Sequence, residues 1–196
     1  MKILIPVTIV LILLQACNHS SENKVAEIPA APVKKIPEKQ SFFPVTEYIR
    51  GQMAEIVQRG ITPKWYVTIN NHTDSSWLRT EMYDKAFNEF LHPEIDSANL
   101  ITLFAEKQFM DQTVNAFTFT YDPIGELPDS MLLQHWDVYV EPKTGKVRRV
   151  YMVKNNGAKT IQLTWQGDKW CSIVHIINKP DGSSAVEKEE KIIWEL

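Results

Sequence analysis

The 196-residue chain contains none of the short motifs that mark the common catalytic and cofactor sites. It has no GxxxxGK(S/T) loop to hold a phosphate, no HExxH or GxSxG motif, and no cysteine cluster with zinc spacing. Positive charge is also scarce: the formal net charge is −3 and the pI is about 6.0, so the chain lacks the basic surface of a nucleic-acid binder. These absences predict no cofactor, no metal site and no nucleic-acid partner.

Long hydrophobic runs are missing as well. The apolar run from Ile3 to Leu14 has 12 residues, whereas a membrane-spanning helix needs about 20. Lys2 precedes this run, and Ala16 stands just before Cys17. One positive charge, a short apolar core and a small residue before the break are typical of a secretory leader. The sequence therefore predicts a signal peptide over residues 1–16.

The residues Leu14-Gln15-Ala16-Cys17 resemble the lipobox of bacterial lipoproteins, whose cysteine is acylated, with palmitate among the acyl groups, and begins the mature chain. The resemblance implies that Cys17 is a lipidation site that ties the protein to membrane lipid through several acyl chains. Asn18 stands where an aspartate retains proteobacterial lipoproteins at the inner membrane, so an outer-membrane anchor facing the periplasm is expected. A signal peptide without lipidation, or a cysteine that is simply buried, is the alternative.

Cysteine is rare, with only Cys17 and Cys171 in the chain. If Cys17 is acylated, Cys171 has no cysteine left to pair with. An oxidising compartment would permit a disulfide, but none is predicted.

The rest of the composition is that of a globular protein, with 44% hydrophobic and 23% charged residues. Residues 17–41 differ: they are polar, contain Pro29, Pro32 and Pro37, and show no helical or strand periodicity. We expect a flexible, semi-extended tether there, although part of it could pack on the domain as an arm. Residues 42–196 are expected to form a single globular domain.

Helices are predicted in the first half of this domain. The apolar stripe between Val45 and Val57 has the spacing of an amphipathic helix, and Gly60 and Pro63 should end it. Its buried side is expected to contain Val45, Tyr48, Ile49, Met53, Ile56 and Val57.

A second helix is expected from cap residues at 72–76 through Leu91, with Leu78, Met82, Ala86, Phe87, Phe90 and Leu91 buried. Asp96 and Ser97 could cap a third, short helix that reaches about Leu103.

Strand patterns dominate the remainder. Residues 64–71 form one expected strand, 104–110 and 114–122 form two more, and 132–178 contains four in succession before a last strand that ends near Trp194. Short turns with Gly and Asn separate most of them, and short connections make neighbouring strands antiparallel. The sequence thus predicts an α+β fold in which N-terminal helices pack on an antiparallel β-meander of about six to eight strands.

The leader, the Pro-Ala tether and the stretches FTFTYDP, HWDVYVEPKTGKVRRVY and NKPDGSS with EKIIWEL resemble a group of uncharacterised lipoproteins of Bacteroidota. The resemblance covers most of the mature chain and implies no particular activity. A shorter stretch, DVYVEPKTGKVRRV, is similar to the hairpin of PepSY domains, whose members are often periplasmic inhibitors or accessory modules.

Three groups of polar residues are of types that could form a catalytic or metal site. Cys171 and His175 share one face of a strand, but four strand residues span about 13 Å, beyond hydrogen-bond reach. His135 with Asp137, and His72 with Asp74, could supply two ligands or an acid-base pair, which is too few for a site, and Asp74 could instead cap a helix.

The third group is a run of alternating charges, Glu187, Glu189 and Lys191. Paired carboxylates can hydrolyse glycosides, but a charged terminal strand is usually a solvated edge. No catalytic residue is predicted from these patterns.

Aromatic residues on the expected strands are the remaining candidates. Trp136, Tyr139, Trp165 and Trp170 could line a cleft between sheet and helices for an apolar or saccharide ligand, or they could simply fill the core. The sequence therefore favours a membrane-anchored, non-catalytic periplasmic binding or accessory module whose partner is an envelope protein. A carrier or sensor of a hydrophobic ligand, and a hydrolase of envelope polymers, are the alternatives.

Overall fold

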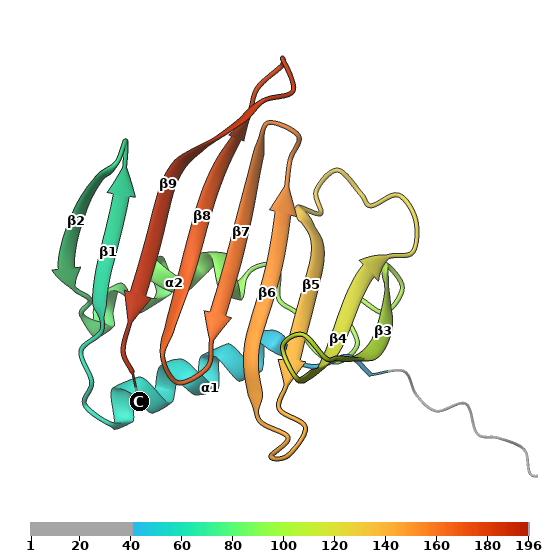
Figure 1. Cartoon of the computed structure of the whole chain (residues 1–196), viewed down its shortest axis with the longest axis horizontal. Coiled ribbons are helices and arrows are strands. Elements are labelled where there is room, and N and C mark those ends of the chain that lie inside the picture. The colour runs from blue at the N-terminus through green and yellow to red at the C-terminus, as the bar shows by residue number, and fades with distance from the viewer. Residues whose placement is uncertain (1–40, 196) are drawn as a thin grey trace, which may run out of the picture. The chain divides into compact units, whose positions relative to one another are not determined.

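Nine strands form one antiparallel sheet in the computed structural model, which describes residues 41–195 (Figure 1). Their order across the sheet is β2-β1-β9-β8-β7-β6-β5-β4-β3. The strands are β1 (Lys64–Ile69), β2 (His72–Trp77), β3 (Phe104–Asp111), β4 (Ala116–Pro123), β5 (Leu133–Val140), β6 (Val147–Asn155), β7 (Lys159–Gln166), β8 (Trp170–Asn178) and β9 (Ser184–Ile193). The helices are α1 (Val45–Gln58), the short 3-10 turn η1 (Thr80–Met82) and α2 (Tyr83–Leu91). The predicted signal peptide, Cys17 and the tether up to residue 40 lie outside the described residues.

The sheet consists of a meander, β3 to β9, and the β1–β2 hairpin, which pairs with the last strand of the meander. From β3 to β9 each strand pairs with the next one, as the short connections predict. Strand β9 then pairs with β1, which brings residues 188–193 beside residues 64–69. The β1–β2 hairpin therefore extends the sheet beyond the C-terminal strand.

The predicted α+β class is confirmed, but its finer description is wrong in two respects. The described residues form nine strands rather than six to eight, and the β1–β2 hairpin separates α1 from α2, so the helices are not one N-terminal block. The cause is the turn Asn70-Asn71, whose φ angles of 51° and 62° are those of a two-residue hairpin loop. Residues 72–77, expected to cap and begin the second helix, therefore pair with β1 as a strand.

The expected short helix over 96–103 is also wrong, because these residues form turns. The Asp96 carboxylate accepts hydrogen bonds from the N–H groups of Ala98 and Asn99, as a helix cap would. The chain nevertheless leaves this turn and enters β3 at Phe104.

Helix α1 ends where the sequence predicts. Gly60 has a φ of 67°, and the N–H groups of Gly60 and Ile61 bond to the carbonyls of Val57 and Ile56, which is the Schellman pattern. The expected buried residue Val57 is 46% exposed, whereas Thr46 is buried because its hydroxyl accepts the N–H of Ile95.

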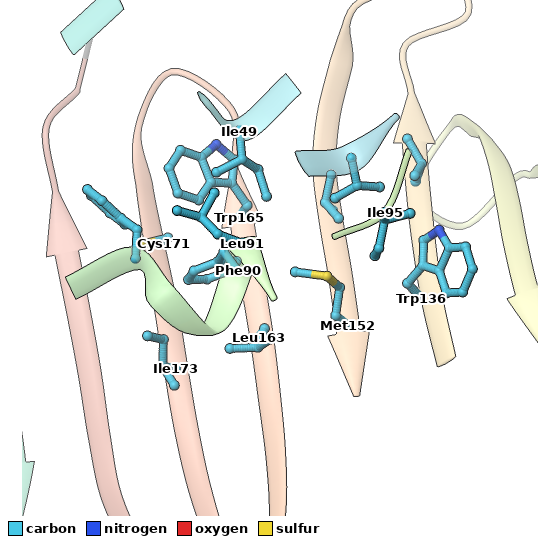
Figure 2. Close-up of a cluster of buried hydrophobic side chains, with 14 of the residues drawn as sticks. Ile49, Phe90, Leu91, Ile95, Trp136, Met152, Leu163, Trp165, Cys171 and Ile173 are labelled. Carbon is cyan, nitrogen blue, oxygen red and sulfur yellow. The ribbon is translucent and has the colours of Figure 1, made fainter. Parts of the chain in front are cut away.

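Both helices lie on the same face of the sheet, and a filled core separates them from it (Figure 1). Figure 2 shows Ile49 of α1 and Phe90 and Leu91 of α2 among side chains of the central strands. Those side chains include Trp136, Met152, Leu163, Trp165, Cys171 and Ile173, all of which are buried. Within residues 41–195, no helix covers the opposite face, which we call the uncovered face.

Candidate functional site

Two of the four aromatic residues expected to line a cleft are core residues. Trp136 stacks on Tyr121 with ring centroids 4.5 Å apart and meets Phe104 edge-on at 4.7 Å. Trp165 packs against Phe87 and Phe90 of α2 at 5.4 and 5.3 Å. Both tryptophans are fully buried, so they fill the space between sheet and helices (Figure 2).

The other two, Tyr139 and Trp170, point to the uncovered face. Trp170 directly precedes the buried Cys171, and consecutive strand residues point to opposite faces. The guanidinium of Arg149 lies 3.9 Å from the Tyr139 ring centroid, and the ammonium of Lys191 lies 5.0 Å from that of Trp170. The four residues therefore lie on two faces and do not line a common cleft, because strand alternation separates them.

The uncovered face is built from the strand residues that alternate with the core. Its central members, from β4 to β8, are Thr118, Thr120, His135, Asp137, Tyr139, Arg149, Tyr151, Val153, Gln162, Thr164, Trp170, Ser172 and Val174. Hydroxyl, amide and aromatic groups predominate, and most of these side chains are half-buried by their neighbours. This mixture of rigid aromatic surface and hydrogen-bonding groups is typical of protein interfaces.

A network centred on His135 crosses this face. The His135 ring nitrogens Nδ1 and Nε2 lie 2.9 Å from Asp122 Oδ1 and 3.1 Å from Asp137 Oδ2. Lys107 Nζ lies 2.9 Å from Asp122 Oδ2, and Thr120 Oγ1 donates to Asp137 Oδ1 at 2.6 Å. The network thus links β3, β4 and β5 through charged hydrogen bonds.

The electrostatics of this network favour the protonated form of the imidazole. Hydrogen bonding to Asp137 raises the pKa of His135, burial opposes that shift, and Asp122 adds to it. Burial would raise the pKa of Asp137, but the hydrogen bonds from His135 and Thr120 together hold it below its usual value. An imidazolium that donates both N–H groups has no free lone pair for a general base. The arrangement links three strands through charged hydrogen bonds.

A second histidine lies on the helix side. His175 Nε2 and Lys188 Nζ approach Glu190 Oε1 at 3.4 and 2.8 Å, and these contacts lower the pKa of the largely buried Glu190 carboxyl although burial alone would raise it. The three groups line an open pocket of about 230 Å³ beside Lys85 and Glu89 of α2. The Glu190 carboxylate therefore already has partners within the protein, His175 and Lys188.

The remaining sequence candidates are dispersed. Cys171 is fully buried, and burial raises the pKa of its thiol, so the neutral thiol is favoured over the thiolate that a nucleophile needs. His72 and Asp74 form an exposed pair at 3.5 Å on the edge strand β2, so Asp74 is not the helix cap considered above. Glu187 pairs with Lys159 at 2.8 Å. Among residues 41–195, no group of three or more histidine, cysteine or acidic side chains could hold a metal ion.

Sequence reasoning paired His135 with Asp137 but missed Asp122, Thr120 and Lys107. Thr120 and Asp122 are two residues apart in β4, so they point to the same face of the sheet. Only the pairing of β4 with β5, which sets Thr120 opposite Asp137, brings them close to His135. That register was not readable from either strand alone.

Comparison with known proteins assigns this chain to no family, because no family model, no curated protein and no solved structure matches it. In the part of the chain that the structure describes, no helix has the length and apolar character needed to cross a membrane.

Proposed function

We propose that this protein is a non-catalytic binding module, anchored in the outer membrane through acylated Cys17 and facing the periplasm. It binds an envelope protein through the uncovered face of its sheet. The observation that carries the proposal is the asymmetry of the sheet, one face of which is sealed by α1 and α2 while the other presents aromatic and hydrogen-bonding side chains.

Two further observations support binding over the alternatives. A carrier of a hydrophobic ligand would need space between sheet and helices, and fully buried side chains such as Trp136 and Trp165 occupy that layer. A hydrolase would need a titratable group free to act, and both ring nitrogens of His135 are engaged by carboxylates. A paired, half-buried network of this kind stiffens a surface and leaves its shape ready for a partner.

The anchor is tested by metabolic labelling with an alkyne-bearing palmitate. The wild-type protein should incorporate the label, Cys17→Ala should not, and the matched control Cys171→Ala should label like the wild type. Equal labelling of the Cys17→Ala protein would show that the lipobox resemblance is misleading.

The binding face is tested by a photo-crosslinking amino acid placed in living cells at Gln162 on the uncovered face. The matched position is Ala54, which is exposed on α1 on the other side of the molecule. A discrete adduct at position 162 and none at 54 is expected. Adducts at 54 alone, or at neither position, would contradict the proposed face.

A further inference from the structure

One end of the sheet exposes large apolar side chains that the core does not use. At the end of the β3–β4 hairpin, Phe109, Met110 and Phe117 are 50%, 41% and 48% exposed. Met110 and Phe117 are opposite each other on the helix side, and Phe109, one residue earlier, points to the uncovered face. The hairpin end is therefore apolar on both of its faces, which an edge hairpin in water does not need.

This apolar end continues into a groove at the start of the described chain. A groove of about 350 Å³ is lined by Ser41, Phe42, Phe43 and Pro44 on one side and by residues of β3 and β4, including Phe119 and Tyr121, on the other. Phe119 is two residues from Phe117 on the same face of β4. The exposed apolar surface thus runs from the hairpin end to the point where the preceding chain joins the domain.

That junction fixes how far the surface can be from the proposed anchor. Cys17 precedes Ser41 by 24 positions, and a fully extended chain of that length spans at most about 85 Å. A chain of this reach holds the hairpin end at high local concentration near the bilayer.

Positive charge surrounds the same end. Lys143, Lys146 and Arg148, in and beside the β5–β6 turn, are exposed and form no ion pair within residues 41–195. Arg148 donates to the carbonyls of Val114 and Asn115 at 3.0 and 3.4 Å, which holds its guanidinium on the β3–β4 turn itself.

The carboxylates in these two turns are engaged locally. Asp111 accepts from the Thr113 hydroxyl at 2.6 Å, and Glu141 accepts from the Thr144 hydroxyl at 2.7 Å. These carboxylates keep their charge, so Lys143, Lys146 and Arg148 leave a net charge of +1 at this end, whereas the chain as a whole has a formal charge of −3.

We infer that the end of the β3–β4 hairpin is a membrane-contact surface, in which Phe109, Met110 and Phe117 enter the interface of an anionic bilayer and the neighbouring cations bind lipid phosphates. Aromatic and long apolar side chains with flanking Lys and Arg are the combination that binds at bilayer interfaces. The inference rests on the proposed membrane anchor. It adds that the domain lies on the bilayer with the end of the β3–β4 hairpin toward the lipid. That orientation would leave the uncovered face open to a periplasmic partner.

The test uses a chain that begins at Asn18, which has no acylated cysteine and retains every core residue, since the core extends from Phe42 to Trp194. It is sedimented with vesicles of phosphatidylethanolamine and phosphatidylglycerol at a ratio of about 3:1, and with pure phosphatidylcholine vesicles. We expect binding to the anionic vesicles that high salt weakens. The double variant Met110→Ser/Phe117→Ser should bind about tenfold more weakly, because two apolar side chains no longer leave water.

The matched control is Ile124→Ser/Val186→Ser, which removes two side chains that are 64% and 62% exposed near the opposite end of the sheet. It should bind the vesicles like the unsubstituted chain, and circular dichroism should show both variants folded. Equal weakening by both double variants, or no vesicle binding by the unsubstituted chain, would overturn the inference. So would a dimer that the Met110→Ser/Phe117→Ser change dissolves, because the surface would then belong to a second copy. Because this chain lacks the acyl group, its result is independent of the palmitate labelling that tests the anchor.

Discussion

At the scale of single residues, His135 shows how a motif that suggests chemistry can have a structural role. Its two ring nitrogens contact carboxylates on the neighbouring strand and on its own strand. Asp122 also binds Lys107, which helps lower the pKa of its carboxyl. Each charge therefore has an opposite charge within hydrogen-bond distance, and the cluster stabilises the sheet as long as all of them remain ionised.

This network predicts a pH-dependent stability. The pKa of His135 is raised above 6.5 in the folded protein, so its contribution is fully present below about pH 6.5 and is lost as the pH rises through the folded-state pKa. Replacing His135→Gln should lower the free energy of unfolding by about 1–3 kcal/mol near pH 5.5 and by less near pH 8.5. Urea titrations at both pH values measure the difference. His72→Gln, at an exposed pair, should change the free energy by less than about 0.5 kcal/mol at either pH. A pH-independent effect of His135→Gln would refute the charge argument.

At the scale of elements, α1 is held to the sheet at two places, the start of β6 and the β7–β8 turn. The Tyr48 hydroxyl donates to the carbonyl of Val147 at 3.4 Å, and the N–H of Asp168 donates to the Gln52 side chain at 3.2 Å. Gly167 lies between these contacts, and a Cβ there would be 2.9 Å from both the Tyr48 hydroxyl and the Val147 carbonyl oxygen. The absence of a side chain at Gly167 is what allows helix and turn to approach.

Substituting Gly167→Ala should therefore destabilise the domain by about 1–3 kcal/mol, because the new methyl group forces α1 away from the turn. The matched change Gly125→Ala places its Cβ in open space and should stay within about 0.5 kcal/mol of the wild type. Thermal and urea unfolding of the two variants would measure this. Similar stabilities for both would show that the helix adjusts without strain.

At the scale of the whole molecule, a single core joins elements from both ends of residues 41–195. It includes Phe42 and Ile49 before the sheet and Ile192 and Trp194 at its C-terminal end. Phe87 of α2 contacts both Trp165 of β7 and Trp194, at 5.4 and 6.4 Å. The helices, the meander and the returning hairpin should therefore unfold together.

Removing one side chain from the centre of this core tests that cooperativity. Phe90→Ala should reduce the free energy of unfolding by about 3–5 kcal/mol, because it removes a fully buried ring and leaves a cavity against Trp165. Tryptophan fluorescence and far-ultraviolet circular dichroism should give the same urea midpoint for this variant. Separate midpoints for the two signals would mean that part of the sheet folds without α2.

The features that the sequence alone determined are local. Apolar spacing and Gly60 placed the end of α1, and strand alternation with short Gly- and Asn-containing turns gave the antiparallel meander, because residues within one element and its turn carry that information. Asn70-Asn71 is a turn signal of the same kind and indicates a hairpin, but residues 72–76 are of the types that cap helices and therefore favour a helix at the same place.

Only the tertiary structure decided which residues from distant elements meet. The pairing of β9 with β1, the burial of Trp136 and Trp165 beneath the helices, and the joining of Asp122 to His135 all depend on strand register and on which sheet face the helices cover. Strand alternation divides the side chains into two sets but does not say which set is buried, because that choice follows from the free energy of packing the whole core. The same holds for the apolar end of the β3–β4 hairpin. Its Phe and Met side chains are of the types found in the core, and only the structure shows that no helix within residues 41–195 packs on them.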